Sequence, residues 1–105
     1  MNSNQKGKRG EREVAKLLQS YGYEARRGRQ FSGSPGSPDV VSDFPHHIEV
    51  KRTESLSLYS AMEQARNDSG DKKPIVFHKR NGKEWLVVMY ADDYLKEKKD
   101  VNIQR

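Results

Sequence analysis

Three ionisable residues near the middle of the chain have the types and spacing of a catalytic site. Asp39 follows a run rich in Gly, Ser and Pro, and Glu49 and Lys51 stand two apart inside the stretch 47–52. Side chains alternate faces along a strand, so Glu49 and Lys51 share one face. If 39–42 pairs with 47–52 as a hairpin, Asp39 joins them. Charged groups near a core are costly unless paired, so the three indicate either a closed ion-pair network or a metal site with a charged helper.

The metal interpretation gives each group a role in phosphodiester chemistry. Two carboxylates and the backbone carbonyl of Val50 are the hard oxygen ligands that Mg²⁺ prefers. Such an ion polarises a phosphate and lowers the pKa of a bound water, and Lys51 beside it orients that water and balances developing charge. The alternative is a Lys–Glu pair on a half-exposed strand, with Asp39 merely ending a loop. The spacing alone leaves both interpretations open.

Hydrophobic periodicity predicts the elements that position these groups. A helix over 10–21 has apolar residues at i, i+3, i+4 and i+7, namely Val14, Leu17, Leu18 and Tyr21. The other elements follow in chain order: strands over 23–28, 39–42 and 47–52, a helix over 56–69, a hairpin of 74–79 and 84–90 around Asn81-Gly82, and a last helix from Asp92 or Asp93. The predicted fold class is α/β, a mixed sheet of about five strands flanked by helices. We expect a disordered tail over 1–7 and a single domain over 8–105.

The composition limits the class of protein. The chain has 105 residues, 32% hydrophobic and 33% charged, and no cysteine, which excludes disulfides and thiolate metal sites. No apolar run is long enough to span a bilayer and no leader peptide is visible, so we expect a cytoplasmic protein without a membrane partner. The net charge of +5 lies entirely in residues 1–30. This asymmetry is typical of a face that meets a polyanion.

The order of motifs resembles a known family of nucleases. Pro38-Asp39 and Glu49-Val50-Lys51 resemble the PD-(D/E)xK motif of the restriction-endonuclease-like nucleases. Four segments are similar, in order and spacing, to archaeal-type Holliday junction resolvases and their phage relatives: KRGEREVAKLL (8–18), GYEARR (22–27), PDVV (38–41) and IEVKR (48–52). The later segments 58–66 and 73–88 resemble that family's next helix and closing hairpin. The chain departs from the pattern in its longer loop, 28–38, and its short tail.

The resemblance implies an activity and a cofactor. It implies a restriction-endonuclease-like core, Mg²⁺ with Mn²⁺ able to substitute, and no small-molecule cofactor. Asp39 and Glu49 are the implied principal metal ligands, beside the carbonyl of Val50 named above, and Lys51 is the implied catalytic lysine. The implied partners are a four-way DNA junction, cut by paired symmetric nicks, and a second copy of the chain in a homodimer. For a phage-encoded protein the implied location is the host cytoplasm.

The helix before the motif supplies a fourth acid. The resemblance implies Glu11, the first acid of GERE, as the upstream acid of the metal site. Periodicity does not choose between Glu11 and Glu13. It places Glu11 one turn before Ala15 and Leu18, near the buried stripe, and Glu13 further round the helix.

The expected DNA contacts lie in the basic N-terminal third, the Gly/Ser/Pro loop and the second helix. They are Lys8, Arg9, Arg12, Arg26, Arg27, Arg29, Phe31 and Gln64. Arg29 and Phe31 would supply charge and a stacking ring from a loop that moulds to the phosphate backbone; the alternative is an ordinary linker. Gln64 fits a polar helper of the site and an exposed helix glutamine equally well. The rival functions are another PD-(D/E)xK endonuclease, of nicking or restriction type, and a basic nucleic-acid-binding module without catalysis.

Three histidines and a tryptophan fall outside this site. We expect His46 and His47 to form a turn pair and His78 to lie on a strand, because no acid or histidine at helical spacing joins them as metal ligands. Trp85 is expected to belong to the core rather than to a base-stacking surface.

Overall fold

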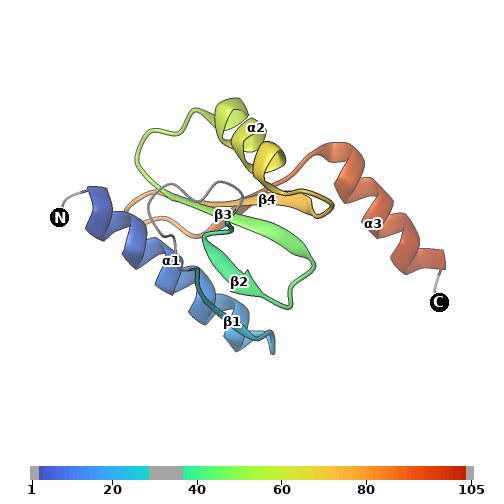
Figure 1. Ribbon diagram of the computed structural model, residues 1–105, viewed down its shortest axis with the longest axis horizontal. Coiled ribbons are helices and arrows are strands. Elements are labelled where there is room, and N and C mark those ends of the chain that lie inside the picture. Colours follow the sequence, from blue (N-terminus) through green and yellow to red (C-terminus); the bar gives the residue numbers. More distant parts are fainter. Residues whose placement is uncertain (1–2, 29–36, 104–105) are drawn as a thin grey trace.

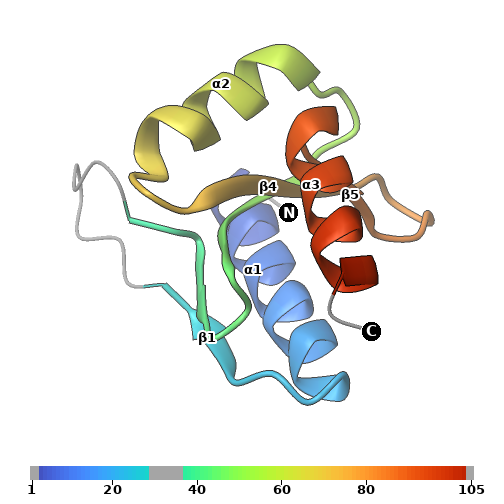
Figure 2. The same cartoon turned by 90° about the vertical axis from the view of Figure 1, so that its right-hand side faces the viewer.

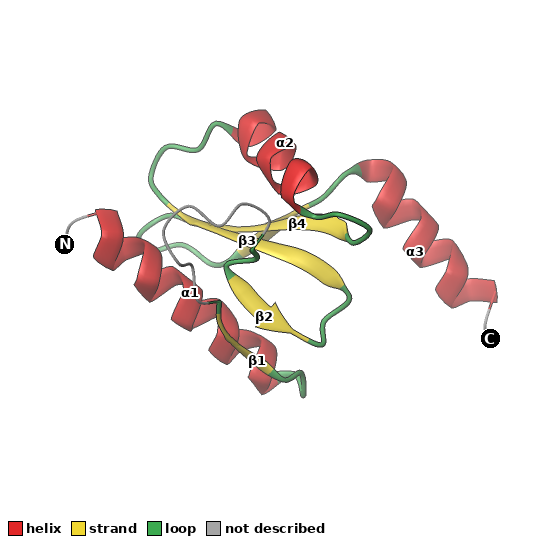
Figure 3. Ribbon diagram, in the orientation of Figure 1, coloured by secondary structure: helices red, strands yellow, loops and turns green. Residues whose placement is uncertain are grey.

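The computed structural model of the protein describes residues 3–28 and 37–103 (Figure 1). The chain forms one mixed five-stranded sheet in the order β1-β2-β3-β4-β5 with three helices around it (Figure 3). The elements are α1 (Ser3–Ser20), β1 (Ala25–Arg27), β2 (Val40–Ser42), β3 (His46–Arg52), α2 (Leu58–Asp68), β4 (Lys73–Lys79), β5 (Leu86–Val88) and α3 (Ala91–Ile103). Their types and order confirm the predicted α/β class. Arg29 and Phe31, two expected DNA contacts, lie outside the described residues.

The first helix differs from its prediction at both ends. α1 begins at Ser3 rather than Gly10, so residues 3–7, which we expected to be disordered, belong to the helix. Lys6 in this extension forms an ion pair with Glu54, 3.6 Å away. Glu54 is distant in sequence, so no local pattern around Lys6 predicts this contact. At the other end Tyr21 is 79% exposed, because the helix stops at Ser20 before Gly22, whose φ is +93°.

Two apolar layers cover the two faces of the sheet. Val14, Ala15 and Leu18 of α1 pack on one face against buried residues of the central strands: Val40, Ile48, Val50, Ile75 and Phe77. Ala61, Met62 and Ala65 of α2 pack on the other face against Val76. Figure 2 shows the strands between α1 and α2. Since both helices have few apolar residues, each buries one narrow stripe and leaves the remainder charged.

Strand pairing decides which side chains share a face. β2 pairs antiparallel with β3, with Val40 opposite Ile48, and β3 pairs parallel with β4, with Glu49 opposite Val76. The hairpin and the crossover through α2 are therefore confirmed. Because side chains alternate along β3, Ile48 and Val50 face α1. The side chains of His47, Glu49 and Lys51 face α2.

The C-terminal part closes the sheet and then leaves it. β4 and β5 form the predicted antiparallel hairpin, and Gly82 at its turn has a φ of +71°, which a residue with a Cβ rarely adopts. α3 extends away from the sheet in Figure 1 and is tied to it by Glu97, which contacts His46 and Lys73. None of the described helices is long and apolar enough to cross a membrane.

Candidate active site

Asp39 and Glu49 lie on neighbouring strands at the point where β2 begins. The backbone N–H of Asp39 donates to the carbonyl of Ile48 at 3.0 Å, and the N–H of Val50 donates to Oδ2 of Asp39 at 2.8 Å. These bonds extend the pairing of Val40 with Ile48 by one residue, so Asp39 stands beside Glu49. The N–H and C=O of a strand residue project to the same side, so the carbonyl of Val50 also faces the strand of Asp39. The hairpin thus brings two carboxyls and one carbonyl together.

The carboxyl of Glu49 keeps its proton to a higher pH than an ordinary glutamate does. Burial, the negative charge of Asp39 and a hydrogen bond with Asp39 raise the pKa of Glu49 to about 9, while Lys51 acts in the opposite direction. Glu49 is only 5% exposed. A neighbouring negative charge and the loss of water both disfavour the ionised form of a carboxyl group. A divalent cation would replace the proton of Glu49, so this donor set fits a hard metal ion.

Lys51 and Gln64 line one hollow between β3 and α2. Lys51 follows Glu49 on the same face of β3 and is half-buried. The hollow has a volume of about 380 Å³, and its wall also includes Thr53, Ser57 and Ser60. The structure therefore places the exposed Gln64 at the same hollow as the lysine. Leu56 and Ala61 also line it, so the wall combines ammonium, amide and hydroxyl groups with apolar side chains.

Glu11 and Glu13 point to different parts of the structure. Arg27 Nε lies 3.2 Å from Oε1 of Glu11. Burial raises the pKa of Glu11, its bond to Arg27 counteracts this, and the negative charge of Asp39 raises the pKa further. Glu13 points elsewhere, to the end of β4 and the following hairpin, where it contacts Lys79 and Trp85. Of the two, only Glu11 lies on the side of the carboxyl pair.

Glu11 does not complete a ready-made three-acid centre. In residues 3–28 and 37–103, no group of three or more His, Cys, Asp and Glu side chains is placed to hold a metal ion together. The carboxylate of Glu11 is paired with Arg27 instead. The same contact occupies Arg27, which we expected to meet DNA phosphate. The roles of Glu11 and Arg27 remain predictions.

His47 is the residue of this site that sequence reasoning missed. His46 and His47 are not a turn pair, as we expected, but the first two residues of β3, and both are buried. Nε2 of His47 lies 2.9 Å from Oε1 of Glu49, and burial lowers the pKa of His47. The signal was available, since residues two apart on a strand share a face. His78 bonds the carbonyl of Thr53, and Trp85 packs partly buried against the α1 face of the core.

The remaining expected DNA contacts are solvent-exposed side chains. Lys8, Arg9, Arg12 and Arg26 are exposed. Arg9 also forms an ion pair with Glu13 at 3.1 Å, one turn along α1. These side chains give α1 and β1 a cationic surface.

Comparison with known proteins agrees with this geometry. A family model described as "Phage putative PDDEXK endonuclease" matches residues 2–105. The chain belongs to this family of phage PD-(D/E)xK endonucleases. A search of the curated proteins finds no significant match to this nuclease.

A solved structure similar to the PD-(D/E)xK nuclease supports its fold. It is Hjc of Archaeoglobus fulgidus, described as a Holliday junction resolvase from an archaeal hyperthermophile. The two share 25% sequence identity, with 77% of this chain and 73% of that chain covered and a TM-score of 0.54. The nuclease therefore has the restriction-endonuclease-like fold that its motifs indicate, in the version seen in Hjc.

Proposed function

We propose that this nuclease is a divalent-metal-dependent endonuclease that resolves four-way DNA junctions by paired symmetric nicks. The observation that carries the catalytic part is the Asp39–Glu49 carboxyl pair with Lys51 on the same face of β3. The similarity to a Holliday junction resolvase over 77% of the chain supports the junction part. The charge excess of the first thirty residues supports a polyanionic substrate.

Each residue of the site takes a distinct role in the proposed hydrolysis. Asp39, Glu49 and the carbonyl of Val50 would hold Mg²⁺, and Mn²⁺ accepts the same ligands. The bound cation supplies Lewis-acid activation of the phosphate and of water. Lys51 orients the attacking water and stabilises negative charge that develops on the phosphate. Glu11, held by Arg27 on the side of Asp39, adds the upstream acid.

Paired nicks need two active sites at a fixed separation, so we infer a two-fold homodimer. β5 is an edge strand of the sheet, and its Leu86 and Val87 are exposed. Tyr94 and Leu95 of α3, which follows β5, are exposed as well. A second copy that covers these apolar side chains and the free strand edge would remove both from water. Light scattering of the wild type and of Leu86→Glu tests this interface.

The test of the function compares a labelled immobile four-way junction with a linear duplex of the same sequence. Wild type, Asp39→Asn and the control Asp100→Asn, which removes an exposed acid from α3, are incubated with Mg²⁺ or with EDTA. We expect symmetric nicks on the junction for wild type and Asp100→Asn, and none with EDTA or Asp39→Asn. Cutting of both DNAs would leave a general PD-(D/E)xK endonuclease. Binding of DNA without any cutting would leave a binding module.

A further inference from the structure

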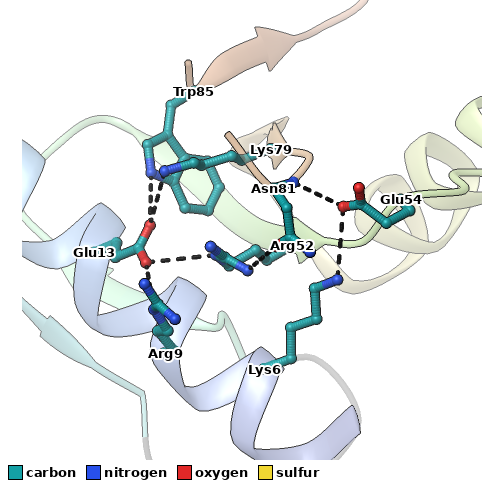
Figure 4. A network of polar contacts seen from close by, with 8 residues as sticks. All are labelled: Lys6, Arg9, Glu13, Arg52, Glu54, Lys79, Asn81 and Trp85. Carbon is teal, nitrogen blue, oxygen red and sulfur yellow. Dashed lines mark hydrogen bonds and ion pairs between the residues drawn. The ribbon is translucent and has the colours of Figure 1, made fainter. Parts of the chain in front are cut away.

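A network of polar contacts joins three parts of the molecule on the α1 side of the sheet (Figure 4). Glu13 of α1 is its first centre. Its carboxylate lies 3.1 Å from Arg9 Nε and 3.4 Å from Arg52 Nε. It also accepts a hydrogen bond from Nε1 of Trp85 at 3.1 Å and lies 3.7 Å from Nζ of Lys79. The network fixes the start of α1 against the end of β3 and the β4–β5 hairpin.

Arg52 is the buried cation of this network. Its side chain is 5% exposed, and its Nη1 donates to Oδ1 of Asn81 at 2.9 Å. Nε is buried and, among the residues that the structure describes, has no hydrogen bond, only the ion pair with Glu13. A guanidinium held at both ends in this way loses little further entropy when it meets an anion. Arg52 is therefore preorganised.

Glu54 is the second centre of the network, on the other side of Arg52. It accepts a hydrogen bond from the backbone N–H of Asn81 at 2.7 Å and forms an ion pair with Nζ of Lys6 at 3.6 Å. The whole network holds four cationic side chains, on Lys6, Arg9, Arg52 and Lys79, against the two carboxylates of Glu13 and Glu54. The surplus of positive charge has no partner in the network itself.

This surplus lines a hollow of about 500 Å³. Its wall consists of Lys6, Arg9, Arg52, Asn81 and Gly82. Three of these residues are cationic and none is acidic. The hollow offers guanidinium, ammonium and amide donors to one anionic group, which is the chemistry that recognises a phosphate.

We propose that this hollow binds a backbone phosphate of the DNA substrate, at a position other than the phosphate that is cut. The proposal rests on the proposed function, because it takes DNA as the ligand. Arg52 directly follows the catalytic lysine Lys51, but consecutive strand residues face opposite sides of the sheet. A DNA backbone that passes the end of β3 would therefore meet Lys51 on one side and the hollow on the other. The second contact would fix the register of the strand in the active site.

Two substitutions and a matched control test the hollow. Lys6→Gln removes one cation from its wall, Asn81→Asp places a carboxylate beside Arg52, and Lys99→Gln makes the same change in net charge on α3. Binding of the fluorescent four-way junction is measured in EDTA over a series of salt concentrations. We expect Lys6→Gln and Asn81→Asp each to weaken binding about 5- to 10-fold and to reduce the salt slope by about one, and Lys99→Gln to change neither.

The outcomes separate this proposal from the proposed function. If the wild type binds the junction and all three variants bind equally well, or all weaken equally, only overall charge matters and the hollow is not a phosphate site. If the wild type binds no DNA, the proposed function fails and this proposal falls with it. Thermal melting guards against misfolding, since Asn81→Asp gains an ion pair with Arg52 and is expected to melt no lower than wild type.

Discussion

Nε2 of His47 lies 2.9 Å from Oε1 of Glu49, two residues further along β3, and both side chains are buried on the α2 side of the sheet. Glu49 also meets the carboxyl of Asp39. The imidazole of His47 thus holds one oxygen of Glu49. The negative charge of Asp39 disfavours the ionised form of the same carboxyl group. Burial lowers the pKa of His47, so the imidazole is neutral at neutral pH and orients Glu49 without neutralising it.

Loss of His47 should weaken metal binding more than it weakens the fold. Partners that orient a metal ligand are worth roughly 10- to 100-fold in metal affinity, so His47→Phe should lower Mn²⁺ affinity by about that factor. His47→Gln places an amide donor near the position of Nε2 and should recover most of the loss. Titration calorimetry with Mn²⁺ and no DNA measures both. Equal affinity in wild type and His47→Phe would show that the contact does not position Glu49.

The metal-free protein should lose stability as the pH rises above 7. The pKa of Glu49 is raised from its ordinary 4.5 to about 9, so the folded state keeps a proton that the unfolded state has released. Its contribution is complete below about pH 4.5 and disappears towards pH 9, with a slope of at most about 1.4 kcal/mol per pH unit. The lowered pKa of His47 acts with opposite sign, but only below about pH 6.5.

Urea unfolding in EDTA between about pH 7 and pH 9 therefore isolates Glu49 from His47. Glu49→Gln should flatten the curve, and Glu63→Gln, which changes an exposed acid of α2, should not. Added Mg²⁺ should stabilise the wild type most at the alkaline end, where less proton has to be displaced. A slope that persists in Glu49→Gln would mean that another group titrates.

Substitution of Glu11 should mainly lower activity, and substitution of Glu13 should mainly lower stability. Glu13→Gln weakens contacts with Arg52 and Trp85 and should lower the free energy of unfolding by about 1–3 kcal/mol. Glu11→Gln should lower the cleavage rate roughly 10- to 100-fold, as expected for a group that supports a metal site, and destabilise less. Chemical denaturation and single-turnover cleavage measure the two effects. The opposite assignment, with Glu13 needed for cleavage, would refute this division.

Gly10 and Gly7, both in α1, should respond to alanine with opposite signs. A Cβ on Gly10 would lie 2.9 Å from Cβ of Arg52 and 3.2 Å from Cγ1 of Val50, so Gly10→Ala should destabilise by about 1–3 kcal/mol. A Cβ on Gly7 meets no atom of the described residues within 4 Å, so Gly7→Ala should stabilise by about 0.5–1 kcal/mol through helix propensity alone. Thermal melts of the two variants decide this, and equal shifts would contradict the close approach of α1 to β3.

The sequence by itself determined the types and order of the elements, the pairing of β2 with β3 and the shared face of Glu49 and Lys51. These properties are local or nearly so. A strand alternates its side chains whatever surrounds it, a short turn leaves an antiparallel hairpin as the simplest pairing, and the apolar stripe containing Val14 and Leu18 is a property of helical spacing. The carboxyl pair followed from these local rules.

Only the tertiary structure decided how the flanking residues divide between the site and the scaffold. Glu11 and Glu13 lie within one turn of the same helix. Which of them faces Arg27 and which faces Arg52 depends on how α1 rotates against the sheet. The start of α1 at Ser3 likewise involves a contact with Glu54, far along the chain. Such choices depend on groups distant in sequence, whose positions no local pattern contains.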